Sequence, residues 1–203
     1  VRGTTLDPNA RALLENAANS VSAGRSSPIG AVFALWSAGP DTGVVNGDFV
    51  VSDTGAAGFG WTSTGSVAIT AEQAVIAEDP TILSGLEQSF VIPDGATALR
   101  FTLTNVLLAA NGAGPPDAFE VSLLGASSNT SLVGTATGLG QTDSLFNLQQ
   151  TGEVYFGPEV TFAGGTSSGQ SLAINTPLVV TGDLTGIPAN KQAKLFFDLL
   201  GFD

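Results

Sequence analysis

Cysteine, histidine and methionine are all absent from this sequence of 203 residues. Their absence excludes catalysis by Ser-His-Asp or Cys-His groups, thiolate redox chemistry, and zinc sites built from histidine or cysteine. A chain without cysteine suits export to a compartment where no disulfide is required, although a cytosolic protein can also lack cysteine.

Positive charge is scarce as well. The chain has 6 basic and 18 acidic residues, a formal net charge of −12, and only 12% charged residues. Six scattered cations cannot neutralise a run of phosphates, so nucleic acid is excluded as a partner. The same scarcity rules out a polybasic patch that would bind an anionic membrane surface.

Long hydrophobic runs are missing too. The longest, Ile29–Trp36, has eight residues, whereas a membrane-spanning helix needs about 18 or more. We therefore expect no membrane insertion. Residues 1–7 are polar and lack the hydrophobic segment of a signal peptide, so an exported protein with this sequence is expected to be a mature or excised form.

The first 43 residues differ in pattern from the rest of the chain. Asp7 is a good N-cap residue and Pro8 a good first helical residue, and apolar residues follow at helical spacing. This pattern predicts one short amphipathic helix from Pro8 to about Ser20. After a break, the apolar run Ile29–Trp36 predicts a buried strand, and residues 39–43 are typical of a linker.

Beyond residue 43 the hydrophobic period changes to two, which is typical of half-buried strands. Apolar and polar residues alternate most clearly in residues 99–103, 119–123 and 195–199. Weaker strand patterns cover residues 49–51, 58–62, 66–70, 73–76, 86–92, 144–148, 154–156, 171–174 and 177–184. Residues 161–171 have a loop-like composition.

Strands at roughly ten-residue spacing, separated by turn residues, are typical of a β-sandwich or a jelly roll. We therefore predict an all-β fold with an antiparallel, jelly-roll-like β-sandwich domain over residues 44–203. Residues 1–43 are expected to supply one short N-terminal helix, an extra strand and a linker.

Carboxylates greatly outnumber their possible ion-pair partners. Eight lie between Arg25 and Arg100, and six more lie between Arg100 and Lys191. Either most are solvated, or some converge on calcium, which takes about six to eight oxygen ligands from carboxylates, amides and backbone carbonyls. Three places in the sequence offer such oxygens: Asn46 and Asp48, Asp117 and Glu120, and Asp198 and Asp203.

Spacing limits how two of these candidates can act together. Asp117 and Glu120 are three residues apart, so on one regular strand they face opposite sides. They share a site only if Asp117 still lies in the preceding turn. In the other interpretation the acids hydrogen-bond turn amides and keep the protein soluble. Glu78 and Asp79 are expected to be solvated loop acids.

Trp36, Trp61 and Tyr155 are the aromatic candidates for stacking on sugar rings. A lone tryptophan in an all-β domain more often fills the core. Trp61 follows Phe59 at strand spacing, which favours a place in the core.

Several segments resemble a known family. Val45-Asn46-Gly47-Asp48-Phe49, followed by Gly60-Trp61, resembles the opening of many bacterial carbohydrate-binding-like jelly-roll modules. Four later segments extend the resemblance: Leu86–Pro93, Ala98–Leu103, Pro116–Leu124 and Leu195–Asp203. Modules of this kind occur in very large secreted or surface proteins of bacteria, including calcium-rich adhesins. The resemblance covers residues 44–203, roughly four-fifths of the chain.

This resemblance implies a non-catalytic module at an extracellular or cell-surface location, often stabilised by calcium. Related modules commonly hold calcium between the opening segment, matched here by Asn46 and Asp48, and a later acidic segment. Asp117 and Asp203 correspond to that later segment.

The family pattern ordinarily continues beyond Gly201-Phe202-Asp203 into a further acidic turn and a last strand. Without that strand, a sheet edge would be left unpaired. A longer chain, the strand Ile29–Trp36 of the same molecule, or that strand from a neighbouring copy would cover the edge.

Two functions of different classes follow. The first is an adhesion or binding module, in which a calcium-stabilised β-sandwich binds a glycan or a protein ligand through its loops. The alternative is a self-assembling surface filament or matrix subunit, joined to other copies by donation of residues 29–36. We expect no catalysis, because a glycosidase needs two carboxyl groups facing a cleft. Asp117 and Glu120, the candidate pair, have unsuitable strand geometry.

Overall fold

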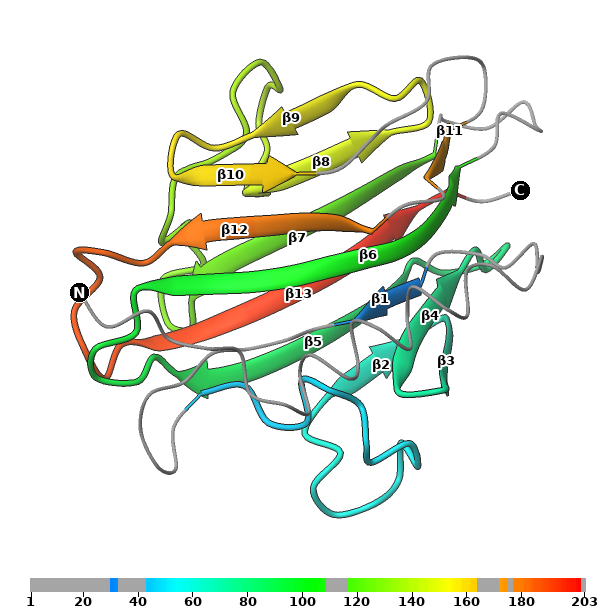
Figure 1. Ribbon diagram of the computed structural model, residues 1–203, viewed down its shortest axis with the longest axis horizontal. Coiled ribbons are helices and arrows are strands. Elements are labelled where there is room, and N and C mark those ends of the chain that lie inside the picture. Colours follow the sequence, from blue (N-terminus) through cyan, green and yellow to red (C-terminus); the bar gives the residue numbers. More distant parts are fainter. Residues whose placement is uncertain (1–29, 33–42, 109–116, 164–171, 175–176, 202–203) are drawn as a thin grey trace.

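All described elements of the chain are β-strands. The computed structural model describes residues 30–32, 43–108, 117–163, 172–174 and 177–201 (Figure 1). Strand pairing within these ranges is antiparallel throughout, and they contain no α-helix. The predicted all-β, antiparallel character is therefore confirmed. The helix predicted from Pro8 to Ser20 lies outside the described residues.

The strands form two sheets. The seven-stranded sheet has the order β10-β12-β6-β1-β4-β3, with β11 paired to β6. Its strands are β1 (Gly30–Val32), β3 (Ser66–Thr70), β4 (Gln73–Ala77), β6 (Ala98–Leu108), β10 (Val160–Ala163), β11 (Leu172–Ile174) and β12 (Leu178–Asp183). The six-stranded sheet has the order β2-β5-β13-β7-β8-β9. Its strands are β2 (Thr62–Thr64), β5 (Ser84–Val91), β7 (Ala118–Gly125), β8 (Phe146–Gln149), β9 (Val154–Phe156) and β13 (Gln192–Leu200).

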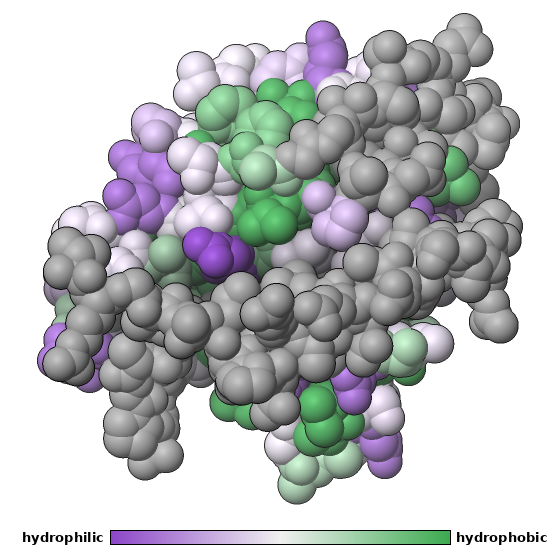
Figure 2. All heavy atoms as spheres, in the orientation of Figure 1, coloured by the Kyte–Doolittle hydropathy of each residue, from purple (hydrophilic) through white to green (hydrophobic). Residues whose placement is uncertain are grey.

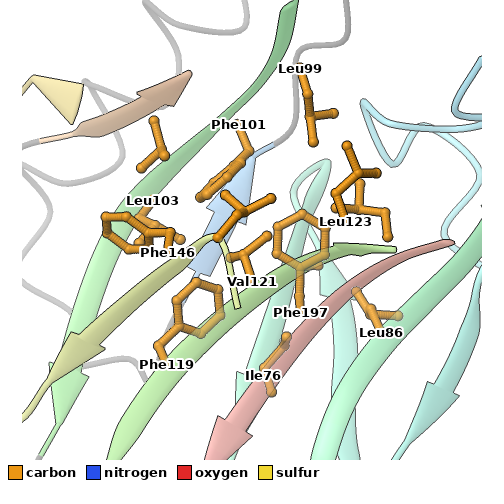
Figure 3. Close-up of a cluster of buried hydrophobic side chains, with 14 of the residues drawn as sticks. Ile76, Leu86, Leu99, Phe101, Leu103, Phe119, Val121, Leu123, Phe146 and Phe197 are labelled. Carbon is orange, nitrogen blue, oxygen red and sulfur yellow. The ribbon is translucent and has the colours of Figure 1, made fainter. Parts of the chain in front are cut away.

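One hydrophobic core is shared by the two sheets. Along β13, buried residues alternate with more exposed ones from Ala193 to Leu199, so one face of the strand points into the core. Fully buried Phe197 lies at the centre, beside Phe101 and Phe119 (Figure 3). Its ring centroid is 5.4 to 6.4 Å from the rings of Phe101, Trp61 and Phe119. Phe101 comes from the seven-stranded sheet, so the ring of Phe197 joins both sheets.

On each side of the two sheets, a short connection joins an edge strand of one sheet to an edge strand of the other. Gly65 separates β2 from β3; its φ is 66°, and a β-carbon there would lie 2.7 Å from Ser84 Cα, so glycine is required. On the other side, residues 157–159 connect β9 to β10. Phe162 of β10, at this second side, is 36% exposed. Figure 2 shows hydrophobic side chains at the surface near β10 and β12.

Most predicted strands are confirmed. The three clearest patterns lie in β6, β7 and β13, and most of the weaker ones match a strand to within two residues. The strands predicted at 49–51 and 58–62 are wrong, apart from Thr62 at the start of β2. Asn46 and Phe49 have φ values of 51° and 54°, which a β-strand does not have. The loop predicted at 161–171 is wrong at its start, which lies in β10; residues 164–171 lie outside the described residues.

The predicted strand Ile29–Trp36 is represented by β1, and its remaining residues lie outside the described ranges. Strand β1 pairs with both β4 and β6. A short part of the predicted N-terminal region therefore belongs to a sheet built mainly by residues beyond 43, and the division of the chain at residue 43 stays a prediction. The part of the chain that the structure describes contains no helix long and apolar enough to cross a membrane.

Phe197→Ala is expected to lower the free energy of unfolding by about 3–5 kcal/mol, because it removes a fully buried ring between the two sheets. Phe196→Ala is the matched control, since the adjacent residue is half-buried on the opposite face of β13. We expect it to cost about 1 kcal/mol or less. Urea unfolding of both variants measures the difference, and equal losses would contradict this placement of the core.

Candidate functional site

A row of mostly polar residues crosses the outer face of the six-stranded sheet. Strand register places Asp198 of β13 between Gly85 of β5 and Glu120 of β7. It also places Asn147 of β8 opposite Glu120, and Tyr155 of β9 opposite Asn147. Because directly opposed residues of antiparallel strands share a face, these five residues lie together on the side away from the core. We call them the polar row.

Strand alternation puts the two carboxylates of the polar row on this face. Each acid lies in sequence between two buried residues, Glu120 between Phe119 and Val121, and Asp198 between Phe197 and Leu199. The neighbours of a core-facing residue in a strand point to the opposite face. Both acids are half-buried in the sheet surface.

Hydrogen bonds orient the amide part of the row. Asn147, which is 1% exposed, donates through Nδ2 to Glu120 Oε1, and Gln149 Nε2 donates to Asn147 Oδ1. At the end of the row, Tyr155 OH donates to Glu153 Oε2 at 3.2 Å. The carboxylate of Glu120 and the amide of Asn147 are therefore held in defined orientations.

Negative charge is concentrated around Asp198. Burial against the sheet, and then the charges of Glu120, Asp143 and Glu87, raise the pKa of its carboxyl group to about 6. Burial also raises the pKa of Glu120; the hydrogen bond from Asn147 opposes this shift, and the charge of Asp143 adds to it. Asp198 therefore keeps its proton into the mildly acidic range.

Gly85 makes room for the Asp198 carboxyl group. A β-carbon at position 85 would collide with Asp198 Oδ1 and would lie 2.7 Å from the main-chain oxygen of Phe197. Our sequence reasoning missed this residue. Its signal is a glycine directly before the strand predicted at 86–92, since a glycine in or beside a strand often marks the close approach of another group.

Asn46, predicted as a calcium ligand, holds a turn together. Its Nδ2 donates to the main-chain oxygens of Val51 and Phe59 at 2.9 and 3.2 Å, and its Oδ1 accepts from Val51 N at 2.9 Å. Asp48, in the same turn, is exposed and accepts from Val50 N at 3.4 Å. The amide group of Asn46 is thus engaged by the main chain.

Gln88 anchors this turn to the core, and sequence reasoning missed it. Its side chain is 3% exposed; Oε1 accepts from Val45 N at 2.7 Å, and Nε2 donates to Val45 O at 2.9 Å and to Gly60 O at 2.7 Å. The available signal is its position, because Gln88 falls on the core-facing side of the strand predicted at 86–92. A polar residue there must find buried hydrogen-bond partners.

Asp117 lies at one end of the core, beside a second acid. It immediately precedes β7 and is 4% exposed, and Glu78 immediately follows β4 of the other sheet. Both carboxylates lie beside Gly201, where a β-carbon would collide with Glu78 Oε1 and would lie 2.8 Å from Asp117 Oδ1. Gln150 donates its main-chain N–H to Asp117 O at 3.1 Å, and its buried side-chain oxygen accepts no hydrogen bond within the described residues. Glu78 is half-buried, so the expectation of a solvated loop acid is wrong.

The predicted calcium ligands fall into separate places: Glu120 and Asp198 in the polar row, Asp117 beside Glu78, and Asn46 and Asp48 in their turn. Gln88, which holds the turn of Asn46, is paired with Leu195 of β13, and Ala118, next to Asp117, is paired with Leu200. These two positions are five residues apart along the strand, or about 17 Å. Asp117 and Glu120 do not share a site. No three carboxylates of the described ranges are grouped so as to hold a metal ion, and Asp203 lies outside these ranges.

The aromatic candidates also separate. Trp61 is buried in the core, as its spacing indicated, and its Nε1 donates to Asn46 O at 3.2 Å. Tyr155 is half-buried at the end of the polar row. Trp36 lies outside the described residues.

Asp198→Asn is expected to change how stability depends on pH. A carboxyl group whose pKa is raised from 3.8 to about 6 by folding stabilises the fold fully below the lower value, and this contribution is lost as pH rises through the higher one. The variant does not titrate, so its advantage in free energy of unfolding over the unaltered protein should grow by about 1 kcal/mol between about pH 5 and pH 8, allowing for solvent screening.

Urea unfolding at both pH values measures this advantage. Asp94→Asn, in the exposed turn between β5 and β6, is the control and should show no such growth. An advantage of Asp198→Asn that shrinks as the pH rises would refute the charge environment described for the row.

Comparison of the chain with known protein families, with curated proteins and with solved structures finds no match. The likeness to bacterial jelly-roll modules therefore stays an expectation from the sequence segments that carry it.

Proposed function

We propose that the chain is a non-catalytic extracellular module that binds a glycan through the polar row. In this proposal its fold is a jelly-roll-like β-sandwich stabilised by calcium, and it belongs to a protein of a bacterial surface. The observation that carries the proposal is the polar row itself, in which Asp198, Glu120 and Asn147 lie on one face of three strands that are adjacent in the sheet, β13, β7 and β8.

The chemistry of the row suits a sugar chain. Sugar sites combine a few oriented polar groups with apolar surface. Here the carboxyl groups of Asp198 and Glu120 can accept hydrogen bonds from hydroxyl groups, and the half-buried rings of Tyr155 and Phe196 offer apolar surface on the same face. The row crosses five strands, which at the usual spacing is about 19 Å. That length fits an oligosaccharide better than a single sugar.

Charge limits which glycan can bind. Glu87, Glu120 and Asp143 lie around Asp198, and the whole chain carries a net charge of −12. A glycan with carboxylate or sulfate groups would be repelled by this face. The ligand in this proposal is therefore a neutral glycan.

The proposal assigns calcium to the end of the core where Asp117 and Glu78 meet. The carboxylates of Asp117 and Glu78 lie there beside Gly201. Gln150 of the β8–β9 turn donates its main-chain N–H to Asp117 O, and its side-chain oxygen is buried and accepts no hydrogen bond within the described residues. Carboxylate and amide oxygens are the ligands that calcium prefers. Asp203, predicted as a ligand, follows Gly201 by two residues in the sequence.

Calcium is expected to raise the melting midpoint by about 5–10 °C over a sample in excess EDTA. A cation at 100 times its Kd adds about 2.7 kcal/mol, and each kcal/mol moves the midpoint of a chain this long by about 2–4 °C. Glu78→Gln should remove this rise. Asn46→Ala should lower the midpoint in both buffers and keep the rise, because Asn46 holds a turn by hydrogen bonds. If the unaltered protein melts at the same temperature in calcium and in excess EDTA, the calcium proposal is wrong.

A glycan array followed by calorimetry tests the binding proposal. We expect neutral oligosaccharides to bind, and Asp198→Asn to weaken binding at least about tenfold, since a charge-assisted hydrogen bond contributes roughly 1.5–3 kcal/mol. Asp183→Asn is the matched control, because it neutralises an exposed acid on β12 of the other sheet.

Three results would count against the proposal. They are the absence of any glycan ligand, binding that is unchanged in Asp198→Asn and in Tyr155→Ala, and cleavage of a bound glycan. Weaker glycan binding by Asp198→Asn would not be caused by unfolding, because this variant is expected to be more stable than the unaltered protein above about pH 6.

A further inference from the structure

Strand β1 lies in the middle of a sheet whose other strands come from distant parts of the chain. It pairs antiparallel with β4 on one side and with β6 on the other (Figure 1). Gly30 is paired with both Val75 and Asn105, and Val32 is paired with Thr102. In sequence, 40 residues separate β1 from β4 and 65 separate it from β6. We call the space between β4 and β6 the β1 slot.

Both walls of the β1 slot have other partners. Strand β4 pairs with β3 over five residue pairs, and β6 pairs with β12 over six. Side chains of both walls are buried in the shared core, among them Ala74 and Ile76 of β4 and Phe101 and Leu103 of β6. The walls are therefore held by contacts that do not involve β1.

An empty slot would be costly. Removing β1 would leave the facing edges of β4 and β6 without a strand, and unpaired main-chain N–H and C=O groups inside a sheet cost free energy and attract other strands. The slot therefore favours binding of a strand that can pair with β4 and β6 at the same time. Residues 30–32 of this chain make that double pairing.

A second copy of the chain carries the same occupant. The sequence puts ten residues, 33–42, between β1 and the next described residue, and ten residues can span up to about 35 Å. This reach allows the strand to enter its own slot or that of an adjacent molecule. The strand–slot pairs are identical in the two cases, so they differ in free energy only through the connecting residues and the concentration of copies.

We propose that the β1 slot accepts residues 30–32 of a second copy, so that molecules associate by exchanging this strand. Reciprocal exchange gives a closed dimer, and sequential exchange gives an open chain of copies. The slot lies in the seven-stranded sheet and the polar row in the six-stranded one, so this proposal does not depend on the proposed glycan binding.

Cysteine cross-linking tests the exchange directly, because the chain has no cysteine of its own. Val32 and Thr102 are directly opposed, so cysteines at both positions lie within the range of a disulfide. Cysteine is also close to valine and threonine in size. Val32→Cys and isotope-labelled Thr102→Cys proteins are purified separately, mixed at high concentration, oxidised, and analysed by non-reducing mass measurement.

The control mixture pairs Val32→Cys with Val179→Cys. Val179 is opposed to Thr102 on the other side of β6, so it lies two strands from β1, about 9.6 Å away and beyond disulfide range. We expect the test mixture to give at least tenfold more labelled–unlabelled dimer, of twice the 20.4 kDa chain mass, than the control mixture.

A double variant, Val32→Cys with Thr102→Cys in one chain, makes a negative result decisive. If it cross-links within the monomer while the test mixture forms no more dimer than the control, the strand stays in its own molecule and the proposal is overturned. If the double variant forms no disulfide within or between chains, the pairing of β1 with β6 is itself wrong, which also overturns the proposal. Glycan binding by Val32→Cys, measured in parallel, should be unchanged, so the two proposals can fail separately.

Discussion

The two-residue period of a β-strand is the constraint on which both the core and the candidate site depend. Phe197 and Asp198 are consecutive in β13, and strand geometry sends the first between the sheets and the second to the outer face. Phe119 and Glu120 of β7 are divided in the same way. Burial of the two phenylalanines therefore also determines which face the two acids occupy. Any slip of register by one residue would exchange core and surface at once.

The two carboxylates of the polar row are expected to lower the stability of the fold. Glu120 and Asp198 are directly opposed carboxylates, and like charges in that position destabilise a sheet. The raised pKa of Asp198 reflects the same conflict. Gly85 and Asn147 accommodate the two acids, one by leaving space and the other by donating a hydrogen bond. Groups with pKa values shifted in this way are more common at functional sites than elsewhere, which supports the proposed role of the row.

The strands that sequence reasoning predicted correctly are those in which the pattern is local and long. Residues 195–199 alternate over a full strand, and no distant residue is needed to recognise them. The errors at 49–51 and 58–62 have a different origin. The turn there is held by Asn46 and by Gln88, and Gln88 lies 43 residues from Val45, whose main chain it binds. A local pattern carries no information about such a contact.

For the candidate site, too, the sequence predicted individual residues but not which distant residues lie next to each other. Glu120 and Asp198 were each predicted as ligands, but as members of different sites, because they are far apart in the sequence; the register of β7 and β13 makes them neighbours. Glu78 was expected to be solvated, and β4 brings it beside Asp117. The sequence by itself determined the all-β, antiparallel class and the acidic surface, since periodicity and charge are properties of short segments. Which acids meet, and which strand fills the middle of the seven-stranded sheet, was decided only by tertiary structure, because strand order and register depend on pairs of residues distant in the chain.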